Sequence, residues 1–145
     1  MKILRFPASG LAVAALLLLA ACQAQPTPAQ QAEQAEKSLL ASHDTLMARM
    51  DELYDLRQKL RAAPAVDTVA AGRQRRALLA ADAAMMDWMH RYQRPADSVA
   101  AARKLAYFAA QQRRIDSVAH LMTSSLDSAR LVLGQAATSP KSSAQ

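Results

Sequence analysis

The stretch that decides the fold is Ser98 to Leu133, SVAAARKLAYFAAQQRRIDSVAHLMTSSLDSARLVL. Its larger apolar side chains recur at steps of three, four and seven residues, which places them along one face of a helix. This face consists of Leu105, Phe108, Ile115, Ala119, Met122, Leu126, Ala129 and Leu133. Such a near-heptad stripe is typical of helices that pack antiparallel in a left-handed bundle. It predicts one long helix, begun by capping residues Asp97 and Ser98 and ended by Gly134.

Two further amphipathic helices are predicted upstream. The first covers residues 32–62, and its apolar face consists of Leu39, Leu46, Met50, Leu53 and Leu60, widened by Leu40, Met47 and Tyr54. The second covers residues 67–92, with Asp67 as its cap, and one continuous apolar arc holds Leu78, Ala81, Met85, Trp88, Met89 and Tyr92. Because this second helix is apolar over most of its circumference, we expect it to lie at the centre of the bundle.

The composition agrees with an all-α domain. No segment shows the apolar–polar alternation of a strand, and the chain after residue 21 has only two glycines, Gly72 and Gly134. About 100 residues are enough for one hydrophobic core. The predicted fold is therefore an antiparallel three-helix bundle over residues 32–133, followed by a polar, disordered tail over residues 134–145.

The N-terminus has the pattern of an export signal. Lys2 and Arg5 precede an apolar run from Leu11 to Ala21. A run of about eleven residues is too short for a transmembrane helix, which needs about 20. We therefore expect residues 1–21 to be a signal peptide.

The end of this run, Leu19-Ala20-Ala21-Cys22, resembles the lipobox of bacterial lipoproteins. The resemblance implies that the Cys22 thiol is diacylated, that the chain is cut before it, and that the bilayer is one partner. Gln23 stands where the family's inner-membrane retention signal is Asp, which favours the outer membrane, with the body facing the periplasm. Residues 22–31 would then be a lipidated cysteine and a flexible polar linker.

The net charge and the cysteine content restrict which other partners and sites are expected. Cys22 is the only cysteine, so its lipidation excludes a disulfide and a thiolate metal site. The formal net charge is +6 and falls to +4 without Lys2 and Arg5. No nucleic-acid partner is expected outside the cytoplasm, whereas weak attraction to anionic head groups is compatible with this charge.

The body has a second, looser resemblance. Residues 81–92, ADAAMMDWMHRY, with the upstream pattern His43-Asp44-x-x-Met47-x-x-Met50, are similar to small helical envelope lipoproteins of uncharacterised function. Some of these carry the name viral A-type inclusion protein. The resemblance implies a helical architecture and an envelope location, and it implies no catalytic residue.

Histidine and methionine cluster at two places that antiparallel helices would bring together. One group lies near the start of the first helix and the other near the end of the second, and together they comprise His43, Met47, Met50, Met86, Met89 and His90. Imidazole and thioether ligands suit copper(I). Methionine also fills irregular gaps in helical cores, so core packing is the competing and favoured interpretation, with no cofactor.

One carboxylate lies inside the apolar arc of the second helix. Asp82 needs a partner there, because an isolated buried charge is costly. His43 and Arg57 are the polar residues on the facing stripe, so we expect a buried polar contact that sets the register of the two helices. A proton-linked or ligand-binding site is the alternative. His43 and Asp44 are expected to point to different faces.

No arrangement of a nucleophile and a base is visible, so no enzymatic activity is expected. The favoured function is a non-enzymatic structural or protein-interaction module whose partner is an unidentified envelope protein. Leu79 and Met86 extend the apolar surface beyond one bundle and make a homodimer a further candidate. The alternatives are a soft-metal binder or sensor, and a chaperone-like binder of unfolded clients. Burial of Met85 and Trp88 would favour the structural or protein-interaction module over these alternatives.

Overall fold

The computed structural model describes residues 25–63 and 67–138, and in these ranges it contains helices and no strand. The helices are α2 (Pro28–Met47), α3 (Met50–Ala62), α4 (Thr68–Arg91) and α5 (Ala101–Thr138). The predicted signal peptide and Cys22 lie outside the described residues, as do residues 139–145.

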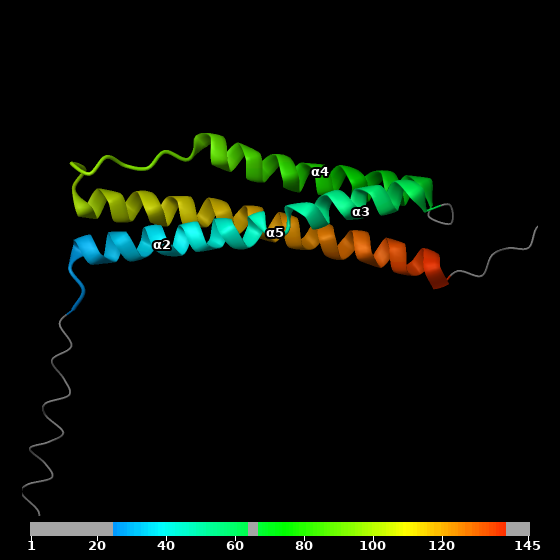
Figure 1. The fold of residues 1–145 in the computed structure, drawn as a ribbon, viewed down its shortest axis with the longest axis horizontal. Coiled ribbons are helices and arrows are strands. Elements are labelled where there is room, and N and C mark those ends of the chain that lie inside the picture. Colours follow the sequence, from blue (N-terminus) through cyan, green and yellow to red (C-terminus); the bar gives the residue numbers. More distant parts are fainter. Residues whose placement is uncertain (1–24, 64–66, 139–145) are drawn as a thin grey trace, which may run out of the picture.

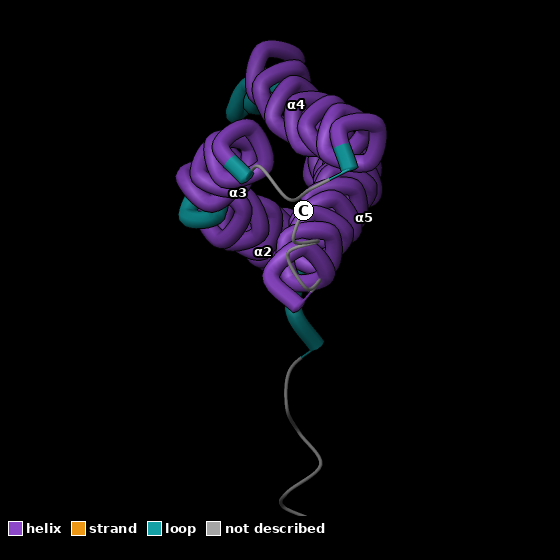
Figure 2. Tube along the Cα trace, turned by 90° about the vertical axis from the view of Figure 1, so that its right-hand side faces the viewer, coloured by secondary structure: helices purple, strands orange, loops and turns teal. Residues whose placement is uncertain are grey.

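The helices form an all-α bundle of three arms, as the sequence predicts. α2 and α3 follow one another in one direction, α4 returns beside them, and α5 runs back along the length of the molecule (Figure 1). Seen end-on, α3, α4 and α5 surround a common centre (Figure 2). No helix in the described part of the chain is long and apolar enough to cross a membrane.

The central helix is α5, and the prediction that the second helix lies at the centre is wrong. α5 packs against each of α2, α3 and α4. α4 instead exposes half of Leu79 (50%) and 42% of Met86 to solvent. Two rows on α5 are buried at seven-residue spacing: Phe108, Ile115, Met122 and Ala129, and beside them Gln111, Val118 and Ser125. The apolar pattern does not reveal the second row, because two of its three members are polar.

The first helix begins earlier than the sequence suggested. Thr27 caps it, with its hydroxyl accepting from the Gln30 backbone N–H and the Gln30 side chain accepting from the Thr27 backbone N–H. Pro28 occupies the first helical turn, where its missing N–H costs nothing. Residues 28–31 therefore belong to α2, and not to a flexible linker.

The predicted helix over residues 32–62 is broken at Ala48 and Arg49, without glycine or proline. The Arg49 N–H donates to the Leu46 carbonyl, three residues back, in a turn tighter than an α-helix. The Arg49 guanidinium donates to Thr123 Oγ1 of α5 at 3.0 Å. A tertiary contact thus accompanies the break between α2 and α3.

The long helix also differs at both ends. Asp97 and Ser98 lie in a turn, and the Ala100 carbonyl accepts the first helical hydrogen bonds of α5. At the other end α5 continues through Gly134 to Thr138, because Val132, Leu133 and Ala136 still pack against the core. Burial there outweighs the roughly 1 kcal/mol by which helical glycine is less favourable than alanine.

Candidate functional site

The most distinctive side-chain contact joins the end of α4 to α2. His43 Nε2 lies 3.3 Å from Met89 Sδ. The other ring nitrogen, Nδ1, lies 3.0 Å from Asp44 Oδ1. The His43 ring also lies against Trp88, with 5.6 Å between ring centroids and 32° between ring planes. One imidazole therefore contacts a carboxylate, a thioether and an indole.

Helical spacing explains how these groups meet. His43 lies between the buried residues Leu39 and Leu46, so it emerges at the edge of the buried face of α2. Met89 is four residues after the fully buried Met85 and occupies the matching edge of α4. Because α2 and α4 run in opposite directions, the two edges meet, as the antiparallel arrangement predicted.

The structure separates the six His and Met residues of the predicted cluster. His43 and Met89 are in contact. Met47, four residues after His43 on α2, is 37% exposed, and Met86, three residues before Met89 on α4, is 42% exposed. Met50 lies beyond the helix break and packs partly buried against the core. His90 is exposed, and its Nδ1 lies 2.8 Å from the Met86 carbonyl oxygen.

Asp44 is the residue that the sequence reading missed. His43 and Asp44 were expected to point apart, yet their side chains meet across one helical step. A His-Asp pair near an apolar stripe is the signal that could have identified it. Among the described residues, no group of three or more His, Cys, Asp or Glu side chains is arranged to hold a metal ion.

Asp82 is paired, but the contact is not the buried one that was expected. Its carboxylate lies 3.7 Å from Arg57 Nη1, and the side chains are 36% and 19% exposed. His43 takes no part and contacts Asp44 instead. Solvent screens a pair of this kind, so it contributes about 0–1 kcal/mol and cannot by itself set the register of the helices.

An aromatic column continues from Trp88 along the molecule. Trp88 stacks on Tyr92 at 5.2 Å, and Tyr107 and Phe108 of α5 follow at 6.2 and 5.6 Å between successive ring centroids. The chain has six Trp, Tyr and Phe residues, and four of them belong to this column. Within the described residues, the buried Trp88 Nε1 and the Tyr92 hydroxyl have no hydrogen-bond partner.

Burial, reinforced by the nearby Glu36 carboxylate, raises the pKa of Tyr92 above its ordinary value of 10.0. The folded chain therefore holds this proton more tightly than the unfolded chain, so ionisation of Tyr92 lowers the free energy of unfolding as the pH rises above about 10. We expect Tyr92→Phe to increase the free energy of unfolding by about 1 kcal/mol at pH 7, because it removes an unpaired hydroxyl.

Denaturant unfolding at pH 7 and at pH 11 tests this prediction. The loss of stability between the two pH values should be smaller in Tyr92→Phe than in the wild type. Tyr54→Phe, at a side chain that is 55% exposed, is the control and should change stability by less than about 0.5 kcal/mol. A Tyr92→Phe chain less stable than the wild type at pH 7 would contradict the prediction.

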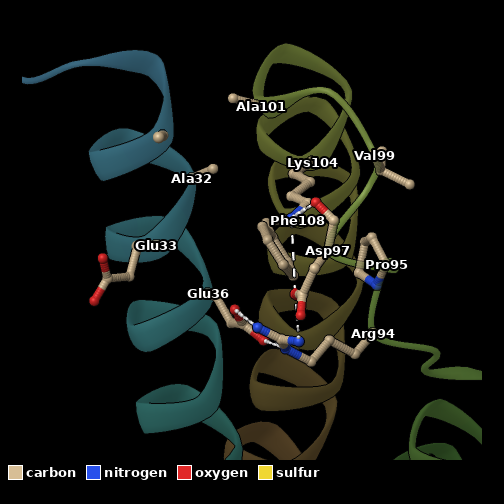
Figure 3. Close-up of a pocket in the computed structure, with 11 residues that line it drawn as sticks. Ala32, Glu33, Glu36, Arg94, Pro95, Asp97, Val99, Ala101, Lys104 and Phe108 are labelled. Atoms are coloured by element: carbon tan, nitrogen blue, oxygen red, sulfur yellow. Dashed lines mark hydrogen bonds and ion pairs between the residues drawn. The ribbon is translucent and has the colours of Figure 1, made fainter.

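The segment between α4 and α5, residues 92–100, borders a pocket of about 380 Å³ with α2 and the start of α5 (Figure 3). Arg94 spans it: Nε donates to Glu36 Oε1 at 2.6 Å and Nη1 donates to Asp97 Oδ1 at 3.1 Å. Lys104 Nζ donates to the Asp97 carbonyl at 3.0 Å. These charges satisfy one another, so the arrangement holds the segment against the two helices. Because Arg94 and Glu36 are 58 residues apart, local sequence gives no sign of it.

The hydroxyl groups of the helices are engaged locally. Ser42, Ser117 and Ser125 each donate to a backbone carbonyl of their own helix. Among the described residues, no serine hydroxyl is hydrogen-bonded to a histidine. No protein-family model, curated protein or solved structure matches this chain.

Proposed function

We propose that this protein is a lipid-anchored module of the bacterial cell envelope that catalyses no reaction and binds a partner protein. The anchor is Cys22, in the lipobox-like Leu19-Ala20-Ala21-Cys22, and Gln23 favours the outer membrane with the body facing the periplasm. The bundle supports the proposal because Trp88 and Met85 are buried in its core, 6% and 0% exposed. A packed core of this kind favours a defined binding surface over a loose cradle for unfolded clients.

The observation that carries the proposal is a pair of exposed apolar rows. On α2 and α3 the row is Leu40, Met47 and Tyr54, which are 41%, 37% and 55% exposed. On α4 the row is Leu79 and Met86, which are 50% and 42% exposed. Within each row the residues are seven positions apart.

The two rows flank the junction between α2–α3 and α4. Two polar contacts cross this junction, His43 with Met89 and Arg57 with Asp82, and each of their residues follows a row residue by three positions: His43 after Leu40, Arg57 after Tyr54, Asp82 after Leu79 and Met89 after Met86. Residues three apart lie on neighbouring parts of a helix surface. The rows therefore line the solvent side of the junction, one on α2 and α3 and the other on α4.

This surface fits an amphipathic helix of another envelope protein. Such helices insert side chains at i, i+3, i+4 and i+7, and the seven-residue spacing of both rows matches that period. Tyr54 has the Arg57 guanidinium 5.7 Å from its ring centroid. Tyr and Arg are the residue types that most often dominate binding energy. We therefore place the centre of the contact at Tyr54 and Met86.

Site-specific photocrosslinking in cells tests this proposal. A benzophenone side chain at position 79 or 86 is expected to capture one protein of defined mass, and the same group at Arg113, an exposed residue of α5, is not. Tyr54→Lys, in the opposite row, should abolish the adduct at position 79, because a change at a contact centre costs about 2 kcal/mol or roughly 30-fold in affinity.

Two results would contradict the proposal. An adduct of twice the chain's own mass would identify a second copy as the occupant and replace the partner protein. Equal capture at positions 79 and 113, insensitive to Tyr54→Lys, would show that the rows are not a binding surface. Thermal unfolding of the purified variants checks that they fold like the wild type.

A further inference from the structure

The contact between His43 and Met89 lies beside the proposed interaction surface, and its chemistry is unusual. The two atoms that face each other, Nε2 and Sδ, come from residues 46 positions apart and lie 3.3 Å from one another in a partly buried place. Both residues border the core, between the buried Trp88 and the exposed rows.

The protonation of the imidazole follows from its other neighbour. An ionised carboxylate only accepts hydrogen bonds, so Nδ1, at 3.0 Å from Asp44 Oδ1, carries the hydrogen. In the neutral ring Nε2 then has a lone pair, and this lone pair faces the sulfur of Met89. Sulfur offers no hydrogen to share. In this form of the ring two acceptors face each other, and a cation between them would bind both, whereas a protonated Nε2 would donate to the sulfur.

The distance fits a shared metal ion. Zinc, a first-row metal, lies about 2.0 Å from imidazole nitrogen and about 2.3 Å from thiolate sulfur. A nitrogen and a sulfur 3.3 Å apart then subtend an angle of about 100° at the metal, close to tetrahedral. The carboxylate on Nδ1 completes the arrangement found around metal-bound histidine, whose free N–H is held by an acceptor that orients the ring and raises its basicity.

The ligand types select the metal. Thioether and imidazole suit soft copper(I), whereas calcium and magnesium require oxygen ligands. The nearest carboxylate, Asp44, is already engaged by Nδ1. The Trp88 ring, whose centroid is 5.6 Å from that of His43, supplies an aromatic face that attracts cations. Met47, four residues after His43, and Met86, three residues before Met89, each lie about one helical turn from the pair and carry the next thioether groups on α2 and α4.

We propose that His43 and Met89 form a copper(I) site, oriented by Asp44, with one of the flanking thioethers of Met47 and Met86 as the third ligand. This site lies where α2 meets α4, so bound copper(I) links the two helices. The metal is expected to quench Trp88, the chain's single tryptophan.

An anaerobic titration of the full chain in detergent tests the proposal. Copper(I) is buffered with bicinchoninate, and Trp88 fluorescence is recorded. We expect quenching that saturates at one copper(I) per chain. His43→Ala and Met89→Leu should each weaken binding by more than about 100-fold, because even the outer partners of metal ligands are worth about 10–100-fold. Asp44→Asn, which changes such an outer partner, should weaken it by about 10-fold.

Two matched variants control for residue type. His120→Ala removes an exposed histidine of α5, and Met122→Leu removes a buried methionine sulfur elsewhere in the core. Both should retain the wild-type affinity. Leucine nearly conserves the volume of methionine, so Met89→Leu is expected to fold, and circular dichroism verifies this.

Three results would overturn the proposal. These are a lack of quenching at saturating copper(I), wild-type affinity in Met89→Leu, and an equal loss of affinity in His120→Ala. Zinc(II) bound at the same residues as tightly as copper(I) would overturn the assignment to a soft metal.

Discussion

The Cys22→Ser chain is expected to incorporate no fatty acid and to be lost from the outer-membrane fraction. Cys22 is the only cysteine of the chain, so it is the only thiol that could carry the proposed lipid. Each buried methylene of an acyl chain contributes about 0.8 kcal/mol, and one chain alone binds only reversibly, with a constant of about 10⁴ M⁻¹. Two or three chains make attachment effectively permanent, so a chain that carries none of them loses this attachment to the outer membrane. Cell fractionation, with incorporation of an alkyne-tagged fatty acid as a second readout, measures this.

A neighbouring substitution provides the control. Gln23→Asp keeps the cysteine and should keep the incorporated fatty acid, but the lipoprotein resemblance implies that the chain then stays in the inner membrane. Density-gradient separation of the two membranes distinguishes the locations. A Cys22→Ser chain that still incorporates the fatty acid, or that still sediments with the outer membrane, would contradict lipid anchoring.

Leu126→Ala is expected to lower the free energy of unfolding by about 2–5 kcal/mol. Leu126 is fully buried, 0% exposed, and belongs to the core cluster on α5, the helix that packs against α2, α3 and α4. The substitution removes apolar contacts and leaves a cavity that rigid neighbours fill only in part. Because small domains are stable by about 5–15 kcal/mol, a large part of the total is lost. Urea unfolding followed by circular dichroism gives the value.

Leu131→Ala is the matched control on the same helix. Leu131 is 66% exposed, so its truncation should change the free energy of unfolding by less than about 0.5 kcal/mol. Similar losses in the two variants would mean that α5 does not lie at the centre of the core, and would contradict the packing described above.

The periodic positions of the core could be predicted from the sequence. Leu39, Leu46, Leu53 and Leu60 are buried in the structure, and so are Ile115, Met122 and Leu126. The reason is that a leucine every seven residues keeps to one side of a helix whatever its neighbours are. The same reasoning places His43 and Met89 at facing edges of antiparallel helices, where the structure has them in contact.

Helix boundaries and the choice of central helix were harder to predict. Leu79 and Met86 lie next to a buried arc in sequence, yet remain exposed because no helix covers that side of α4. The break at Arg49 goes with a contact to Thr123, which is 74 residues away. Hydrophobicity alone does not show which apolar face finds a partner, because that depends on the path of the other helices.

The sequence by itself determined an all-helical body, the seven-residue rows of leucine that it buries, and Cys22 as the one thiol. These properties follow from local periodicity and composition, which need no knowledge of the rest of the chain. Only the tertiary structure decided that α5 is central, that Met47 and Met86 face solvent, and that His43 Nε2 faces the Met89 sulfur with Asp44 on its other nitrogen. The physical reason is that burial and side-chain contact are set by which surfaces meet when the three arms pack, and each arm carries more apolar surface than one bundle can cover.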